Sequence, residues 1–489
     1  MYSTTTLEAW FSAFRQNIIG YEQTFESPYG QQRIVYADWT ASGRSYGPIE
    51  RQIQEEILPY FGNIHTRTTI TGKTMSDAYD AAKRCIKTHV NATEEEVLVF
   101  CGSGMTAAVN KLQRIMGLRM PERIMDYAEG FQLDEEARPL VLVTHMEHHS
   151  NHISWLETIA TVEIIRPDEV GNVDLNHLRE LLQRFGRRKC KIAAITACSN
   201  VTGIETPVQE ITAIMHEHDG LCFVDYACSA PYVSINMHPE KNGAHLDAIY
   251  FSFHKFLGGP GTPGVLIFNN KLYRNRIPDH PGGGTMLYSN PWKVHEYITD
   301  PEQREDGGTP PTLQGIKAGM CIRLKEEMDI DKMRLREQEM LGHLFHRLDR
   351  ISGIEILGAD RQRLGVLSFT VKNAQYNLVV KILNDRFGIQ ARGGCSCAGT
   401  YGHHLLHIDQ SRSCQILDSL KAGEMWHKPG WVRLSIHPVM TNAELDYIID
   451  AVETTVARYG EWSKDYRYDP ASDEYLYRSA NLLDLKPHH

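Results

Sequence analysis

Between about residues 90 and 270, short apolar runs alternate with segments of helical pattern, and this alternation constrains the fold more than any other feature. Most of the runs are continuously apolar, as expected for strands that are buried on both faces. Helix-like segments at 105–116, 174–184 and 208–218 separate them. Alternating strands and helices predict an α/β domain with a mostly parallel sheet. The candidate strands are 97–100, 140–143, 162–165, 192–196, 221–225, 248–253 and 265–268.

The end of the chain has a different pattern, which predicts a smaller α+β domain. Its candidate helices cover about 330–351, 376–387 and 442–459, and its candidate strands are 354–357, 366–371 and 431–436. We therefore divide the chain into four parts: an N-terminal segment (1–45) that packs on the small domain, a large domain (46–325), a small C-terminal domain (326–460), and an arm or tail (461–489).

Charge and cysteine usage exclude several classes of protein. The formal net charge is −10, which argues against nucleic-acid or anionic-membrane partners, because such partners favour basic patches. The sequence contains no run of 18 apolar residues, so we predict no membrane span. The first residues do not resemble a secretory signal. The ten cysteines show no disulfide framework, so we expect free thiols and a cytoplasmic location.

The strongest local signal is Ser252-Phe-His254-Lys255 at the end of an apolar strand. A lysine amine that is partly neutral and held in a pocket forms a Schiff base with an aldehyde cofactor. Ser252 and His254 could then bind a phosphate group. The alternative interpretation is a surface lysine at a strand end.

A second apolar strand ends at Asp225. A buried carboxylate is costly unless it is paired, and in an enzyme that uses pyridoxal 5'-phosphate (PLP) it pairs with the protonated pyridine nitrogen. The alternative is an aspartate that caps the next helix.

Two further segments follow predicted strands. Residues 101–106, Cys-Gly-Ser-Gly-Met-Thr, open a helix and could form an anion site, but they lack the spacing of a dinucleotide-binding turn. Residues 144–151 contain Glu147, His148 and His149. A histidine here could stack on a flat cofactor ring, and a zinc site is the alternative.

The small domain contains a glycine-rich loop at 392–399 that carries Cys395 and Cys397. A thiol on such a loop can reach a site built elsewhere, so Cys397 is a candidate nucleophile. A metal site is the alternative, but the spacing matches no zinc pattern, and we predict no metal site. The other candidate ligands in this region are His403, His404, His407 and Cys414.

Together these motifs resemble class V aminotransferase-fold PLP enzymes of the group II cysteine desulfurase and selenocysteine lyase type. The resemblance runs from about residue 36 to 459. The motifs occur in the family's order: Met-Glu-His-His-Ser-Asn at 146–151, Ser-Asn-Val-Thr-Gly at 199–203, Val-Asp at 224–225, Ser-Phe-His-Lys at 252–255, Gly-Gly-Gly-Thr at 282–285, Gly-Thr-Pro at 308–310, Arg-Gly-Gly-Cys-Ser-Cys at 392–397, and Arg433 in a strand.

The resemblance implies the PLP-dependent transferase fold of type I and a homodimer with shared active sites. It implies that His148 stacks on the pyridine ring, Asp225 pairs with its nitrogen, and Lys255 forms the internal aldimine and moves the Cα proton. The other cofactor contacts that it implies are Ser252, His254, Thr106, Asn200 near the ring oxygen, and Thr309 of the partner subunit.

On the substrate side, the resemblance implies that Arg433 clamps the carboxylate and that Cys397 accepts sulfur. Three departures from the family's pattern concern the site. Cys228 stands where the family usually has a glutamine that bonds the cofactor's phenolic oxygen. His65 is followed by Thr-Arg where the family has Arg-Gly, which affects expected substrate contacts. The region between Cys397 and Arg433 is longer than the family's norm.

These features lead to the hypothesis of a cysteine desulfurase that converts L-cysteine to L-alanine and leaves a persulfide on Cys397, with a possible sulfur-acceptor protein as partner. The alternative on the same fold is a class V aminotransferase, a C–S lyase or an epimerase that acts on another amino acid. A third hypothesis is a non-enzymatic metal-binding module built on Cys395, Cys397 and the nearby histidines.

Overall fold

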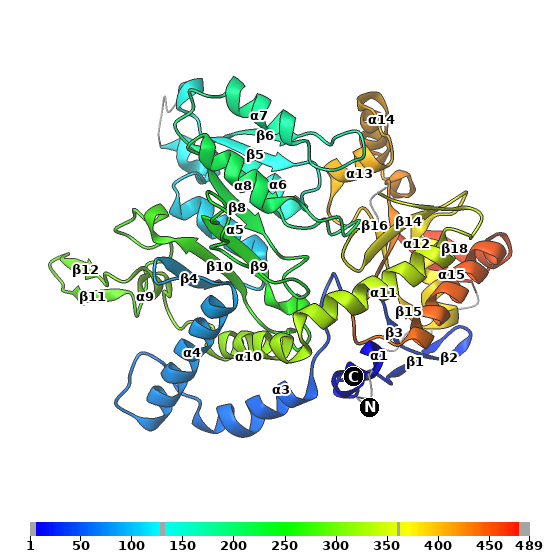
Figure 1. Ribbon diagram of the computed structural model, residues 1–489, viewed down its shortest axis with the longest axis horizontal. Coiled ribbons are helices and arrows are strands. Elements are labelled where there is room, and N and C mark those ends of the chain that lie inside the picture. Colours follow the sequence, from blue (N-terminus) through cyan, green and yellow to red (C-terminus); the bar gives the residue numbers. More distant parts are fainter. Residues whose placement is uncertain (1–5, 128–132, 359–361, 479–489) are drawn as a thin grey trace. The chain divides into compact units, whose positions relative to one another are not determined.

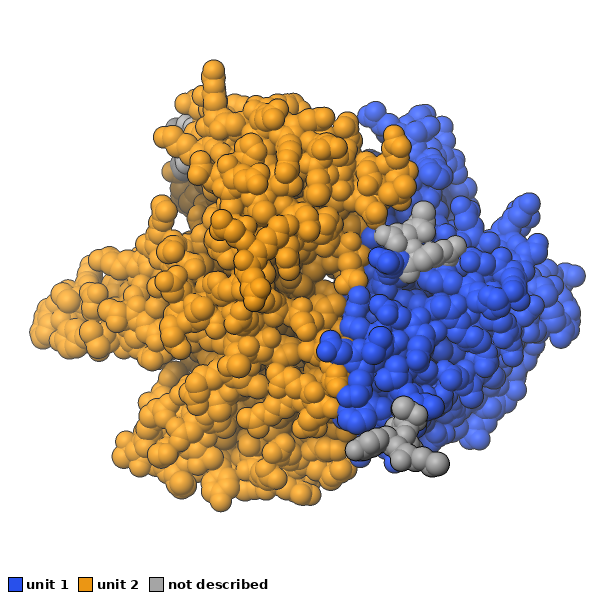
Figure 2. Space-filling model, viewed as in Figure 1, with its two compact units in different colours: residues 1–41, 200–204, 331–489 blue, residues 42–199, 205–330 orange. Residues whose placement is uncertain are grey.

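The computed structural model describes residues 6–127, 133–358 and 362–478. The chain forms two compact units, coloured separately in Figure 2. Unit 1 contains Met1–Ala41, Asn200–Ile204 and Asp331–His489, and unit 2 contains Ser42–Ser199 and Glu205–Ile330. Residues before Ala41 thus group with the C-terminal part of the chain.

Unit 2 is built on a seven-stranded sheet with the order β4-β10-β9-β8-β7-β5-β6 (Figure 1). Strands β5 to β9 pair in parallel, and β10 is antiparallel to both β4 and β9. The prediction of a mostly parallel α/β sheet is therefore confirmed. The strands are β4 (Glu96–Cys101), β5 (Leu140–Thr144), β6 (Thr161–Ile165), β7 (Lys191–Thr196), β8 (Leu221–Asp225), β9 (Ala248–Ser252) and β10 (Gly264–Asn269).

Most strands of this sheet are largely apolar because both of its faces are buried. Every residue of β4, β5, β7 and β9 is buried, and Val99, Val141 and Phe223 belong to one apolar cluster with Trp155 of a covering helix. Burying each such side chain stabilises the fold by about 1.5–3 kcal/mol. The helices of unit 2 are α3 (Gly47–Gln52), α4 (Ile70–His89), α5 (Met105–Ile115), α6 (His149–Leu156), α7 (Leu175–Arg184), α8 (Val208–Glu217), α9 (Pro301–Glu305) and α10 (Thr312–Met328).

Strands β4, β5, β7, β8 and β9 run in one direction, so their carboxyl ends meet at one edge of the sheet. In open α/β sheets, ligands bind outside this edge. Asp225 is the last residue of β8 and Ser252 is the last residue of β9. The topology therefore brings these two candidate residues to the same edge.

Unit 1 contains a four-stranded antiparallel sheet with the order β13-β14-β17-β16. A separate parallel pair joins β3 to β15, which links the N-terminal segment to the rest of this unit. The strands are β3 (Val35–Tyr36), β13 (Ile354–Ile356), β14 (Val366–Val371), β15 (Ile389–Gln390), β16 (Arg392–Gly394) and β17 (Trp431–Ser435). The helices are α1 (Leu7–Trp10), α2 (Ser12–Arg15), α11 (Ile330–Leu348), α12 (Tyr376–Phe387), α13 (Gly399–Leu405), α14 (Gln410–Lys421) and α15 (Asn442–Trp462).

Three hairpins were not expected from the sequence. One, β1 (Thr24–Ser27) with β2 (Gly30–Arg33), lies near the N-terminus, and another, β11 (Met286–Ser289) with β12 (His295–Tyr297), follows the Gly-Gly-Gly-Thr segment. The third, β18 (Tyr466–Asp469) with β19 (Glu474–Tyr477), lies where an arm or tail was expected. It forms because Tyr466 is buried against Leu378, Ile382 and Trp462. Across residues 6–127, 133–358 and 362–478, no helix has the length and apolar character needed to cross a membrane.

Candidate active site

Asp225 is buried at the carboxyl edge of the unit 2 sheet, where its Oδ1 accepts a hydrogen bond of 2.8 Å from the Ala227 N–H. Burial raises the pKa of Asp225 to about 6, while the Ala227 hydrogen bond and the charge of Lys255 act in the opposite direction. Lys255 therefore lies close enough to stabilise the carboxylate. The structure brings together the two residues that the sequence singled out first.

Lys255 ends a short 3-10 turn, Phe253–Lys255, that follows β9 directly. The turn is anchored because the Gly43 N–H donates to the His254 carbonyl oxygen over 2.8 Å. Gly259 packs so closely that a Cβ there would lie 1.9 Å from the Phe253 carbonyl oxygen, which explains a glycine at this position. Burial and the Lys255 charge lower the pKa of His254 to about 4, so its imidazole is neutral near pH 7.

Three candidate phosphate contacts gather around the start of α5. The Met105 N–H donates to Ser252 Oγ over 2.8 Å. A Cβ on Gly104 would lie 3.0 Å from Ser252 Oγ and 3.7 Å from the His254 ring, so only a glycine leaves this turn open. Thr106 Oγ1 lies in the first turn of α5, 2.7 Å from Ser150 Oγ. An anion fits here, because N–H groups and hydroxyls converge at the N-terminus of an eleven-residue helix.

His148 is the N-cap of α6, and its Nδ1 accepts a hydrogen bond of 3.1 Å from the Ser150 N–H. This bond assigns the acceptor role to Nδ1 and sets the direction of the ring. His148 is thus held on the element that follows β5, at the same sheet edge as Asp225.

A buried polar network that sequence reasoning missed lies next to His148. Tyr250 donates to Asn151 Oδ1 over 2.6 Å, and the Asn151 amide donates to Glu147 Oε2 over 2.8 Å. Glu147 Oε1 also accepts from the Thr144 hydroxyl over 2.7 Å. Burial raises the pKa of Glu147 to about 8 despite these bonds, and the charge of Asp225 adds to the rise. Asn151 belongs to the segment 144–151 that the sequence analysis singled out. Its hydrogen bond with Tyr250 could not be predicted, because the two residues are 99 positions apart in the chain.

Cys228 is buried, and its Sγ lies 3.7 Å from the Ser199 carbonyl oxygen, to which it donates. Thr309 is exposed on the same unit. His65 lies beside the loops that flank Thr309: its Nε2 is 3.1 Å from the Gly308 carbonyl oxygen, and a Cβ on Gly284 would meet its ring at 2.4 Å.

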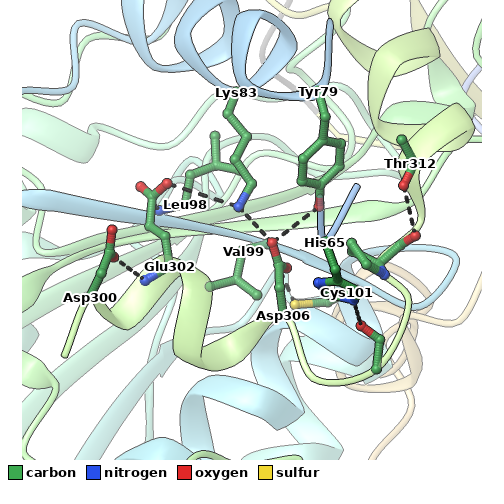
Figure 3. Close-up of polar contacts among 12 residues, drawn as sticks. His65, Tyr79, Lys83, Leu98, Val99, Cys101, Asp300, Glu302, Asp306 and Thr312 are labelled. Atoms are coloured by element: carbon green, nitrogen blue, oxygen red, sulfur yellow. Dashed lines mark hydrogen bonds and ion pairs between the residues drawn. The ribbon is translucent and has the colours of Figure 1, made fainter. Parts of the chain in front are cut away.

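His65 also lines a polar cavity of about 880 Å³ in unit 2, whose walls are shown in part in Figure 3. Lys83 Nζ lies 2.9 Å from Asp306 Oδ2, and Lys87 Nζ lies 2.7 Å from Glu302 Oε1. Glu302 Oε1 also accepts from the Leu98 N–H of edge strand β4 over 2.9 Å. The lysines of α4 thus form ion pairs with Glu302 and Asp306, and Glu302 also bonds strand β4. These contacts hold α4 and α9 against the edge of the sheet.

In unit 1, Arg433 is buried on β17 and faces Asp38, which sequence reasoning missed. Arg433 Nη2 lies 2.8 Å from Asp38 Oδ1, and Arg433 Nη1 donates to the Asn200 carbonyl oxygen over 3.0 Å. Arg392 Nε lies 3.0 Å from Asp38 Oδ2. One carboxylate is therefore shared by two guanidinium groups, and the group of three charges keeps a net positive charge that suits a substrate carboxylate.

Cys397 is exposed on the loop that follows β16. Ser396 and Cys397 both have left-handed backbone conformations, with φ of 51° and 55°, which non-glycine residues rarely adopt. The Asn200 amide donates to the Ser396 carbonyl oxygen over 2.7 Å, while Asn200 Oδ1 is buried and has no partner among the described residues. Asn200 thus links the Cys397 loop to Arg433.

The alternative of a metal site around Cys395 and Cys397 is not supported by the part of the chain that the structure describes. His403 there binds the Gly399 carbonyl oxygen and the Ser413 hydroxyl, each over 2.8 Å. Within the described ranges, the cysteines and nearby histidines of this loop do not gather their donor atoms into a possible metal site.

Comparisons with known proteins place the chain in a family. The model of the family described as "Aminotransferase class-V" matches residues 35–448. A probable cysteine desulfurase of Halalkalibacterium halodurans is 28% identical over 374 residues, which are 75% of this chain and 84% of the relative. A probable cysteine desulfurase of Staphylococcus aureus is 28% identical over 372 residues, with the same coverage.

Two solved structures have a similar fold. The apo structure of a cysteine desulfurase from Thermococcus onnurineus has a TM-score of 0.72 at 22% identity, and the cysteine desulfurase CsdA of Escherichia coli has a TM-score of 0.70 at 19% identity. Each comparison covers 91% of this chain and 98% of the other. With a family match over most of its length and a lysine beside a buried aspartate at the expected sheet edge, the chain belongs to the class V aminotransferase family of enzymes.

Proposed function

We propose that the protein is a PLP-dependent cysteine desulfurase that converts L-cysteine to L-alanine and retains the sulfur as a persulfide on Cys397. The observation that carries the proposal is the exposed side chain of Cys397, whose backbone is left-handed. Its loop is held by a hydrogen bond from the Asn200 amide to the Ser396 carbonyl oxygen. An accessible thiol on such a loop is suited to accept a sulfur atom and to pass it on. The names of the curated relatives agree with this activity.

The residues of unit 2 fit PLP. Asp225 would face the pyridine nitrogen, and the Lys255 amine would bond the aldehyde. The open turn at Gly104 would receive the phosphate, with Thr106, Ser252 and His254 around it. The bound cofactor supplies an electron sink that stabilises negative charge at the substrate Cα.

Other residues would orient the cofactor's ring. His148, with Nδ1 already bonded to the Ser150 N–H, would present its ring face for stacking. Cys228 would lie near the phenolic oxygen in place of an amide, and because a thiol is a weak hydrogen-bonding group, it would stabilise that oxygen less. The Asn200 amide nitrogen already donates to the Ser396 carbonyl oxygen, so Asn200 would present its Oδ1 to the ring oxygen of the cofactor.

The chain's own residues would perform the chemistry in three steps. Arg433, with Arg392, would bind the substrate carboxylate, and Lys255 would remove the Cα proton. The Cys397 thiolate would then attack the substrate sulfur, so that an S–S bond forms as the C–S bond breaks. The electron pair of the C–S bond stays on carbon, which is protonated to give alanine.

Exchange of Cys397 for alanine tests the proposal. Cys397→Ala should keep the visible absorbance of bound cofactor but lower alanine formation from L-cysteine by more than about a hundredfold, because the sulfur acceptor is gone. Cys395→Ala, two residues away and half-buried, is the matched control and should retain activity. Full turnover by Cys397→Ala would refute the proposed role.

The products identify the reaction if the desulfurase proposal fails. Pyruvate with free sulfide would indicate a C–S lyase, and a keto acid without sulfide would indicate an aminotransferase. A change of substrate configuration alone would indicate an epimerase. The assay needs only a panel of amino acids and the spectrum of the bound cofactor.

A further inference from the structure

A second group of reactive side chains lies at the opposite edge of the unit 2 sheet. His216 lies in the last turn of α8, and His245 and Asp247 lie in the segment just before β9 (Figure 1). The Asp247 carboxylate accepts a hydrogen bond of 2.8 Å from the N–H of Cys222, near the start of β8. Asp225 ends that same strand three residues after Cys222, so the Asp247 group lies about 10 Å from Asp225 along β8.

The hydrogen bonds of His216 fix its tautomer. Its Nδ1 lies 2.7 Å from the Gly243 carbonyl oxygen, which can only accept, so Nδ1 carries a hydrogen. Its Nε2 lies 2.9 Å from Asp247 Oδ2. In the neutral ring the Nε2 lone pair would face a carboxylate oxygen, and this contact is favourable only if a proton or a metal ion lies between the two atoms. In metal-binding histidines the ring nitrogen that does not bind the metal commonly donates to a backbone carbonyl oxygen, as His216 Nδ1 does to Gly243.

His245 supplies a second imidazole to the same place. Its ring stacks on His216 with centroids 4.2 Å apart and an interplanar angle of 27°. The His245 side chain is exposed, so its ring can turn a nitrogen toward the other two side chains. One donor atom from each of His216, His245 and Asp247 lies within 4.8 Å of the others.

We propose that His216, His245 and Asp247 form a binding site for a divalent transition-metal ion of the Zn²⁺ class, which ties α8 to the segment before β9. Two imidazole nitrogens and one carboxylate oxygen are a known ligand set for Zn²⁺, with water in the fourth position. Bonds of about 2.0–2.1 Å need donor atoms closer together than 4.8 Å. The exposed His245 side chain can rotate to close this gap, whereas hydrogen bonds already hold His216 and Asp247.

The nearest rival explanation is a simple ion pair between protonated His216 and Asp247, with His245 as a stacked neighbour. The two explanations differ in the role of His245, which is a ligand only in the metal site. His238 offers no fourth ligand in this conformation, because its Nε2 faces Glu96 Oε2 at 3.1 Å.

Zn²⁺ binding to the full-length holoenzyme, freed of unbound cofactor, tests the proposal. Equilibrium dialysis of the wild type should show one Zn²⁺ equivalent that His245→Ala binds at least about tenfold more weakly. Asp247→Asn, which keeps the size of the side chain, should weaken binding similarly. His218→Ala, in the same turn as His216, is the matched control and should bind like the wild type. Equal binding by the wild type and His245→Ala, or no binding at all, would overturn the proposal.

Co²⁺ provides a second readout that separates this site from the thiols of Cys395 and Cys397. A site of two nitrogens and one oxygen gives no intense thiolate-to-metal absorption. Spectra of bound Co²⁺ should therefore lack that band in the wild type, and the Co²⁺ absorbance should be lost in His245→Ala. A strong thiolate band that survives in His245→Ala would place the metal at cysteines and refute the site.

Discussion

A charged Asp225 is costly to the fold, because the effect of burial exceeds that of the nearby Lys255 charge. Its pKa lies at about 6, above the ordinary value of 3.8, because burial disfavours the charged form. The folded apoprotein therefore loses stability as pH rises from about 3.8 to about 6, and the loss is constant above that range. A shift of this size corresponds to at most ~3 kcal/mol. A positively charged group bound next to the Asp225 carboxylate would offset this cost.

Asp225→Asn should accordingly stabilise the apoprotein against urea at pH 7.5 by up to ~3 kcal/mol, while it weakens cofactor retention. The advantage of the variant should shrink as pH falls through 6 and vanish near pH 4, where the wild-type carboxyl is also neutral. Urea titrations of both apoproteins at several pH values measure this difference. A pH-independent difference would show that the carboxyl is not perturbed by burial.

Single residues were predictable from the sequence where a strand end or a glycine turn marked them. Asp225 ends one apolar strand and Lys255 lies on the turn after another, so their common edge followed from the parallel sheet. Asp38 could not be predicted, because it meets Arg433 across 395 positions and no local pattern marks it. The same holds for His216 and Asp247, 31 positions apart, which meet only after α8 packs against the sheet.

At the scale of elements, the hairpin of β18 and β19 depends on one buried ring. Tyr466 is 2% exposed, and its hydroxyl lies 3.2 Å from Asp385 Oδ2. Tyr466→Ala should destabilise unit 1 by about 3–5 kcal/mol, as loss of a buried aromatic ring does. Tyr466→Phe keeps the ring and should cost only about 0.5–1.5 kcal/mol. Urea unfolding followed by circular dichroism measures both, and equal effects of the two variants would contradict the packing role.

The elements themselves were predicted where burial leaves a clear pattern. All seven strands of the unit 2 sheet were expected, most of them because burial on both faces makes them continuously apolar, whereas edge strand β6 is only partly buried. Strand β16 was missed because Arg392-Gly-Gly has no strand propensity, and it forms only by pairing with β17. The hairpin β18–β19 was missed because its alternating tyrosines lie in a polar segment that resembles a tail.

At the scale of the whole molecule, we propose that two copies of the chain complete each other's sites through the exposed Thr309. Lys255→Ala and Thr309→Asp homodimers should both be impaired, the second because a carboxylate repels the cofactor's phosphate. A hybrid dimer of the two chains contains one site with both Lys255 and Thr309 intact if Thr309 acts across the interface. Separately tagged, co-expressed chains should then show about half the activity of the wild-type dimer. Activity no higher than that of the parent homodimers would contradict the shared site.

The central claim is that one amine, on the turn after β9, bonds the cofactor opposite a buried carboxylate. Borohydride reduction fixes such a bond permanently, and peptide mass mapping then identifies the modified residue. We predict that the reduced holoprotein carries the pyridoxyl group on Lys255 and that Lys255→Ala carries none. A label on another lysine, or an unlabelled wild type after incubation with PLP, would contradict the account.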